Sequence, residues 1–250
     1  MFMETPRSLT VEVAGKEVRI ATRGSGAQAY VLVPGIGVSP RYFVPLAREL
    51  AAVGTVHTVE LPGFGGSRKP RRRLEMTDFA GIVRQALAEA GVGPAVLIGH
   101  SMGCQIVAEM TLARPELTQS LVLLGPTTNS AERNRFLQGL RLAQDTLREP
   151  PQINYVVFSD YLRSGPRWYF TTVPVLVHHR LEEALARISV PILILRGERD
   201  PIVPRRWTQE LAATSASACA GEVEGEAHVL MFRRPRTVAA ACQQLAELTA

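Results

Sequence analysis

The feature that most constrains this chain is a serine set between a short apolar strand and a helix. Residues 95–98 form an apolar run typical of a buried strand. Ser101 follows between Gly99 and Gly103, and apolar residues then recur at helical spacing until Pro115. This order, with the pattern G-x-S-x-G, indicates a nucleophile elbow, in which a tight turn lifts the serine hydroxyl clear of the sheet. The alternative is a serine that caps a helix in an inert turn.

Short apolar strands alternate with amphipathic helices on both sides of the elbow. Residues 9–13 and 16–21 alternate in polarity around Ala14-Gly15, which predicts a hairpin. A helix is expected after Ser39-Pro40, and another with Thr77 as its N-cap. The remaining strands are expected at residues 30–33, 55–61, 95–98, 120–124, 191–195 and 219–223. The pattern predicts the α/β class, with a mostly parallel eight-stranded sheet flanked by helices.

The alternation of strands and helices stops between the sixth and seventh strands. Residues 126–187 show several helices and no convincing strand, and they hold seven of the fifteen aromatic residues. We therefore predict an α/β core at 1–125 and 188–250 and a helical lid at 126–187. Pocket walls are expected from Trp168, Tyr169 and Phe170, because three adjacent rings on a helix cannot all face one way. Val229 is a further candidate for the pocket wall. The alternative is that these rings form only the core of the lid.

A serine hydroxyl needs a base to become a nucleophile, and the base needs a group that orients it. Of five histidines, only His228 lies in a loop after the last strand, where open α/β sheets place functional loops. Of four aspartates, only Asp200 follows the C-terminal end of a sheet strand. Elimination by position gives the catalytic set Ser101, Asp200 and His228. Taken singly, Asp200 could be a turn residue before Pro201 and His228 a surface histidine.

Acyl transfer also requires donors for a tetrahedral oxyanion. The backbone N–H of Met102, directly after the serine, is one candidate. The second is expected from Ile36, in the loop after the third strand, where Gly35 and Gly37 let the backbone approach a substrate closely.

Composition limits the partners and the compartment. The chain has 250 residues, a net charge of +5 and 46% hydrophobic residues, which fits one globular domain with a large core. The only dense basic run, residues 68–73, has no interleaved aromatics and is expected to be a solvated loop. A nucleic-acid patch is the alternative. We expect a small-molecule substrate, no nucleic-acid partner, no cofactor and no metal, while a homodimer stays open.

Three dispersed cysteines, Cys104, Cys219 and Cys242, have no metal-ligand spacing and suggest reduced thiols. The first residues lack an apolar signal core, and no apolar run is long enough to span a bilayer. A cytoplasmic protein without a membrane span is therefore expected.

With these residues in view, the chain resembles the α/β-hydrolase superfamily, in its lid-bearing serine esterase and C–C hydrolase branch. The matching stretches are VLVPGIG, ELPGFGGS, GHSMG, PILILRGERDPIVP and GEAH. It departs from the pattern of many relatives at Pro34, Cys104 and Glu60, where His, Gly and Asp are common. None of these departures removes a predicted catalytic group.

The resemblance and the residues together predict a cofactor-independent serine hydrolase acting on a small, largely apolar ester, thioester or lactone. Its rate is expected to rise with pH as neutral His228 becomes available, with an apparent pKa near that of ordinary imidazole. The alternative is hydrolysis of a C–C bond in a vinylogous diketone, although such relatives often carry Asn and Trp where His100 and Val229 stand. A third hypothesis is a non-catalytic ligand receptor on this fold.

Overall fold

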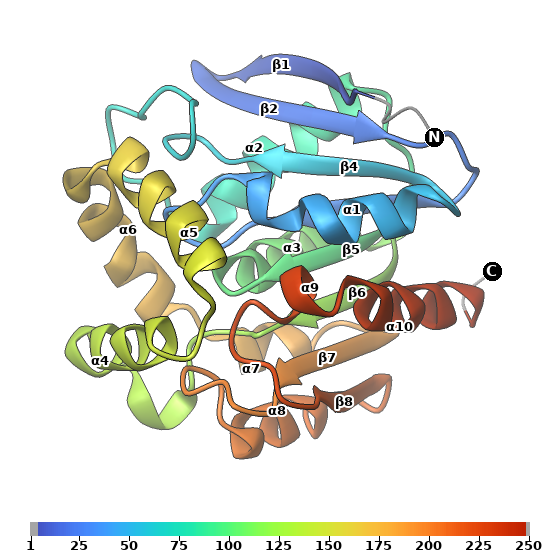
Figure 1. Cartoon of the computed structure of the whole chain (residues 1–250). Coiled ribbons are helices and arrows are strands. Elements are labelled where there is room, and N and C mark those ends of the chain that lie inside the picture. The colour runs from blue at the N-terminus through green and yellow to red at the C-terminus, as the bar shows by residue number, and fades with distance from the viewer. Residues whose placement is uncertain (1–4, 249–250) are drawn as a thin grey trace.

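The computed structural model describes residues 5–248, and a single eight-stranded sheet runs through its centre (Figure 1). The strand order is β1-β2-β4-β3-β5-β6-β7-β8; β1 and β2 run antiparallel to their neighbours and all other pairs are parallel. The strands are β1 (Arg7–Val13), β2 (Lys16–Arg23), β3 (Ala29–Val33), β4 (Thr55–Glu60), β5 (Ala95–His100), β6 (Thr118–Leu124), β7 (Ile192–Gly197) and β8 (Ala218–Val223). The predicted mostly parallel sheet is confirmed.

The first two strands form the predicted hairpin. Val13 pairs with Lys16, and the two residues between them, Ala14 and Gly15, have φ values of 47° and 73°. Positive φ at both central positions is the two-residue turn whose twist matches that of the flanking strands.

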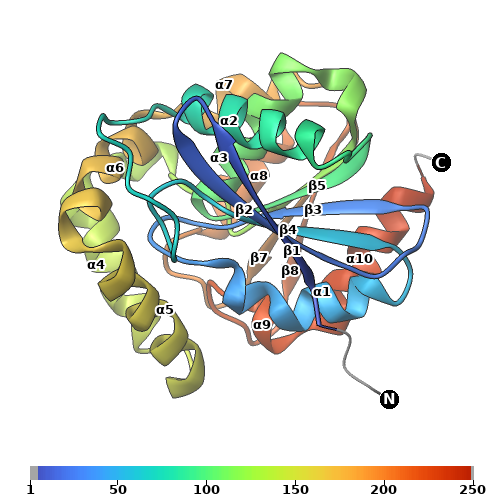
Figure 2. The same cartoon turned by 90° about the horizontal axis from the view of Figure 1, so that it is seen from above.

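Helices cover both faces of the sheet (Figure 2). One layer contains α1 (Val44–Ala51), α9 (Leu230–Arg233) and α10 (Pro235–Glu247). The other contains α2 (Met76–Glu89), α3 (Met102–Ala113), α7 (Leu181–Leu185) and α8 (Arg205–Ala212). Side chains alternate along β3, so that Val31 and Val33 join the core under α2 and α3 while Tyr30 and Leu32 join the core under α1 and α10.

Three further helices lie together at one end of the sheet (Figures 1 and 2). They are α4 (Arg135–Thr146), α5 (Pro151–Ser164) and α6 (Pro166–His178), and we call them the lid helices. They follow β6 and precede β7, where the sequence predicts an inserted lid. The predicted boundaries of that lid, 126 and 187, stay a prediction, and α7 packs against α3 and α8 of the sheet's flank.

One local expectation is corrected. The predicted N-cap Thr77 lies inside α2, whose N-cap is Glu75; the Glu75 backbone N–H donates to Asp78 Oδ2 at 3.1 Å. The helix expected after Ser39 does begin at Pro40 with Ser39 as its N-cap, as a 3₁₀ turn, Pro40–Phe43, that leads into α1. Across residues 5–248, none of the helices combines the length and apolar character needed to cross a bilayer.

Candidate active site

Ser101 lies in a strained turn between β5 and α3. Its φ of 55° and ψ of −119° are unfavourable for a residue with a side chain, and its N–H donates to the Leu124 carbonyl at 2.9 Å. The flanking glycines allow this conformation: a Cβ at Gly99 would lie 2.5 Å from the Gly103 carbonyl carbon, and one at Gly103 would overlap the Val33 carbonyl. The sequence pattern therefore folds into the expected sharp turn.

His228 and Asp200 form a buried hydrogen-bonded pair. His228 Nδ1 lies 2.7 Å from Asp200 Oδ2, and the other carboxylate oxygen, Oδ1, accepts from the backbone N–H groups of Ile202 and Val203 at 2.8 and 3.1 Å. Because a carboxylate can only accept, the proton of neutral His228 sits on Nδ1. Nε2 is then left as the nitrogen that can accept a proton.

Carboxylates around His228 change its acid–base behaviour. Burial lowers the pKa of His228, but the charge and hydrogen bond of Asp200, together with the charges of Asp145 and Glu149, outweigh burial and raise it to about 9. The sequence predicts an ordinary imidazole here. That expectation is corrected: buried Asp200 raises the pKa of His228 most, and Asp145 and Glu149, from a lid helix and the turn that follows it, raise it further.

The other candidate acids and bases are held in separate pairs. Asp160 accepts from Ser39 N and Oγ at 2.9 and 2.7 Å and pairs with Arg41 at 2.6 Å. His179 pairs with Glu109 at 2.8 Å. These contacts give the two residues structural partners outside the His228–Asp200 pair.

His100 connects two loops of the site, a role that the sequence did not reveal. Its Nε2 donates to the His228 carbonyl (3.2 Å), its Nδ1 accepts from the Tyr42 hydroxyl (3.0 Å), and that hydroxyl accepts from Gly35 N–H (2.9 Å). Burial, with a further contribution from His228, holds the pKa of His100 well below its usual range. A neutral His100 therefore completes a chain of hydrogen bonds from the β3 loop to the histidine loop.

The two predicted oxyanion donors belong to the β3 loop and to the start of α3. Ile36 lines a cavity that residues of the lid helices also line, and the preceding Gly35 packs so closely that a Cβ there would lie 3.1 Å from Ser101 Cβ. Met102 is the first residue of α3, where helical N–H groups have no partner within the helix. Both N–H groups thus belong to segments that adjoin the serine.

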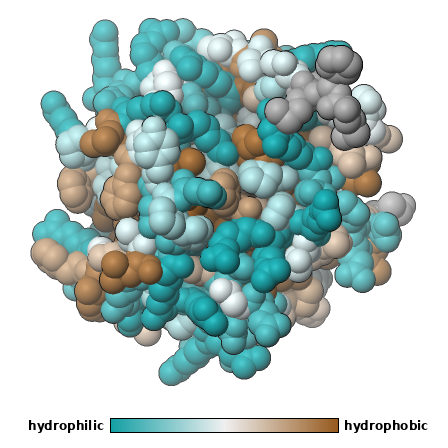
Figure 3. Space-filling view, in the orientation of Figure 1, coloured by the Kyte–Doolittle hydropathy of each residue, from teal (hydrophilic) through white to brown (hydrophobic). Residues whose placement is uncertain are grey.

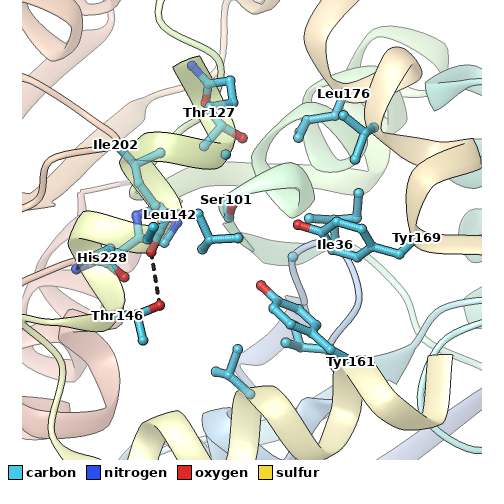
Figure 4. Close-up of a pocket in the computed structure, with 18 of the residues that line it drawn as sticks. Ile36, Ser101, Thr127, Leu142, Thr146, Tyr161, Tyr169, Leu176, Ile202 and His228 are labelled. Atoms are coloured by element: carbon cyan, nitrogen blue, oxygen red, sulfur yellow. Dashed lines mark hydrogen bonds between the residues drawn. The ribbon is translucent and has the colours of Figure 1, made fainter. Parts of the chain in front are cut away.

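A cavity of about 720 Å³ opens between the sheet and the lid helices (Figure 4). Ser101 and His228 line it together with Ile36, Tyr161, Tyr169 and other mostly apolar residues. Three phenylalanines that also line it are largely exposed: Phe136, Phe158 and Phe170. Figure 3 shows apolar side chains gathered over α4, on the lower left of that view. The cavity therefore opens to solvent beside apolar lid side chains.

The predicted pocket residues divide into two groups. Tyr169, Phe170 and Val229 line the cavity. Trp168 instead is buried in the core, with its ring 6.3 Å from that of Phe64, so the prediction of a pocket wall at Trp168 is corrected. The rings separate because adjacent helical residues point about 100° apart.

Two carboxylates near the cavity were not predicted as functional. Asp145 Oδ1 accepts from the His228 backbone N–H at 3.1 Å, and Glu149 Oε1 accepts from that of Val229 at 2.7 Å. Burial raises the pKa of Asp145 to about 6 and that of Glu149 to about 7. These contacts join residues at least 80 positions apart, so local sequence carries no signal for them.

Comparisons with known proteins show the family of the chain. A model of the alpha/beta hydrolase family matches residues 30–241. The chain is 24% identical over 245 residues to the (E)-2-((N-methylformamido)methylene)succinate hydrolase of Acinetobacter baylyi, covering 91% of this chain and 93% of that protein. It is 29% identical over 150 residues to the dihydrolipoyllysine-residue acetyltransferase component of the acetoin cleaving system of Cupriavidus necator. That match covers 60% of this chain and only 40% of the other protein.

Solved structures share the fold at low sequence identity. The enol-lactonase from Burkholderia xenovorans LB400 superposes with a TM-score of 0.83 at 17% identity, covering 96% of this chain and 100% of that one. Est816, described as an N-acyl homoserine lactone degrading enzyme, gives 0.81 at 21% identity, covering 94% and 99%.

Proposed function

The chain belongs to the alpha/beta hydrolase family, and we propose that it is a serine hydrolase that cleaves a small, largely apolar ester, thioester or lactone. The observation that carries the proposal is one cavity with two chemical features. Ser101, in its strained turn, and His228, bonded to Asp200 at 2.7 Å, both line this cavity.

The proposed mechanism follows from the roles that each position allows. His228 Nε2 takes the proton of Ser101 as the serine oxygen attacks the substrate carbonyl. The N–H groups of Met102 and Ile36 donate to the resulting oxyanion. His228 then protonates the leaving oxygen or sulfur, and water releases the acyl group by the reverse sequence. Asp200 holds the ring in the required tautomer and stabilises its charged form.

The cavity wall supports an apolar acyl group as the favoured substrate part. Tyr169, Phe170 and Val229 all line it, and its volume exceeds what a short acyl chain needs. The esterases and lactonases with this fold act on carbonyl substrates of the proposed kind according to their descriptions. Hydrolysis of a vinylogous diketone remains the alternative for the same catalytic set.

The test is turnover of a panel of p-nitrophenyl esters, lactones and vinylogous diketones, combined with covalent labelling by a fluorophosphonate. We expect ester or lactone turnover, an adduct on the Ser101 peptide, and a kcat about 10⁴-fold lower for Ser101→Ala. Ser130→Ala, outside the cavity, is the control and should keep the wild-type rate. Near wild-type kcat in Ser101→Ala would overturn the proposal, and turnover confined to diketones would favour the alternative. A folded protein with neither turnover nor labelling would point to a receptor.

A further inference from the structure

The loop that carries His228 is held from two sides by side chains of distant segments. On one side, the His228 carbonyl accepts from His100 Nε2 at 3.2 Å. On the other side, Asp145 and Glu149 accept from two successive backbone N–H groups, those of His228 and Val229. Leu142 and Thr146, both of α4, line the same cavity as His228 (Figure 4). Within residues 5–248, the lid therefore bonds the backbone of His228 and Val229 through the end of α4 and the turn after it.

The two carboxylates suit this task chemically. They are one helical turn apart in sequence, and only 4% and 8% of their respective surfaces are exposed. A buried backbone N–H needs an acceptor, and an ionised carboxylate is a stronger acceptor than a neutral group. Removing either one would leave a buried donor without its partner.

We propose that Asp145 and Glu149 are positioning residues that clamp the histidine loop to the lid and, by their charge, strengthen His228 as a base. This inference rests on the proposed function, because the clamp acts through the histidine that would take the serine proton. It extends that function to the end of a lid helix, because the same contacts that hold the lid against the histidine loop also position His228.

The charges around the clamp give it a signature in pH dependence. Asp145 faces His228, Asp200, Glu149 and Arg148, while Glu149 faces Asp145, His228 and Asp200. At the pH where His228 titrates, both clamp carboxylates are ionised, and each favours the protonated ring. Removing one charge must therefore lower the pKa of His228, whereas a purely structural contact would leave it unchanged.

The experiment separates hydrogen bonding from charge with paired variants. Asp145→Asn and Glu149→Gln keep an acceptor oxygen but lose the charge, while Asp145→Ala and Glu149→Ala lose both. We expect the amide variants to keep the plateau kcat within about 3-fold and to shift the acidic limb of kcat/KM down by about one pH unit. The alanine variants should lose about 10- to 100-fold in kcat, because the base is misplaced. Glu132→Gln, which removes a lid carboxylate that pairs with Arg141, is the matched control and should change neither quantity.

The titration of the His228 ring, followed by NMR, provides a readout that needs no substrate. A lowered ring pKa in Asp145→Asn and Glu149→Gln supports the clamp even if the substrate class is wrong or an alanine variant fails to fold. The clamp is overturned if the ring titrates as in wild type in both amide variants, or if folded alanine variants keep full kcat. Failure of the proposed function is distinct, since it would appear as absent turnover and labelling in the wild-type protein.

Discussion

Replacing Asp200 by asparagine should disable His228 while leaving the loop in place. Asp200 Oδ1 accepts from two backbone N–H groups, at 2.8 and 3.1 Å, and Oδ2 accepts from the ring. An asparagine would keep its single oxygen on the two N–H groups, because turning it over would set its NH₂ against both donors. The NH₂ group would then face His228 Nδ1 and force the proton onto Nε2, the nitrogen that must accept the serine proton.

The expected loss in kcat is about 10⁴-fold, the size associated with the wrong tautomer in a catalytic triad. This corresponds to about 5.5 kcal/mol of transition-state stabilisation. KM should change little, because Asp200 is not one of the residues that line the cavity in the described part of the chain. The acidic limb of kcat/KM, which wild type should show near pH 9, should move to lower pH, since the largest pKa-raising partner of His228 has lost its charge.

The assay is the pH dependence of kcat and KM on the best ester found in the panel. Glu198→Gln is the control from the same loop: Glu198 Oε2 accepts from Gly225 N–H at 2.8 Å, a bond that a glutamine oxygen can keep. It should retain kcat within about 3-fold. The reasoning fails if Asp200→Asn keeps more than a tenth of the wild-type kcat, or if Glu198→Gln is the more damaging change.

Three further outcomes are expected. Tyr169→Ala should change the ratios of kcat/KM across an acyl-chain series by about 10-fold, because Tyr169 lines the cavity. Trp168→Ala should leave these ratios unchanged and lower the free energy of unfolding by about 3 kcal/mol, because Trp168 is buried in the core. Altered ratios in Trp168→Ala and unchanged ratios in Tyr169→Ala would contradict these positions. Gly125→Ala should reduce kcat at least 10-fold without loss of fold, because φ is 54° there and a Cβ would lie 2.9 Å from His228 Cε1; an unchanged rate would show that the ring is free to move. Burial raises the pKa of Glu149 to about 7, so the folded protein favours its protonated form. The stability this gives is complete below the pKa of Glu149 in the unfolded chain and is lost as pH rises through 7. From pH 5 to pH 8, the free energy of unfolding measured in urea should therefore fall about 2 kcal/mol more for wild type than for Glu149→Gln. Equal decreases in the two proteins would contradict this role of Glu149.

Local patterns in the sequence predict the sheet and the elbow well. The apolar run at 95–98, followed by G-x-S-x-G, predicts a strand, a turn and a helix, and Ser101 has the strained φ that this turn requires. Asp200 and His228 could be selected by position alone, since each follows the carboxyl end of a strand in a parallel sheet. Their hydrogen bond supports that selection.

Contacts between distant segments explain what could not be predicted. Asp145 follows no strand of the sheet, so its position in the chain does not select it, yet its carboxylate reaches a residue 83 positions later. Trp168 and Tyr169 are neighbours of similar character, and only the packing of α6 decides that the first enters the core and the second lines the cavity. The raised pKa of His228 likewise depends on which carboxylates the fold brings beside it.

The three cysteines give this protein a built-in set of probes for local opening. Cys219 is exposed on β8, Cys242 is buried in α10, and Cys104 is buried in α3, where its Sγ lies 3.2 Å from the Gly99 carbonyl oxygen and 3.4 Å from that of Leu124. A thiol reagent should modify Cys219 at once, while the other two can react only when their surroundings open. The rate at Cys104 would then measure how often the strained turn relaxes, and the rate at Cys242 would show whether that relaxation is separate from fraying of the last helix.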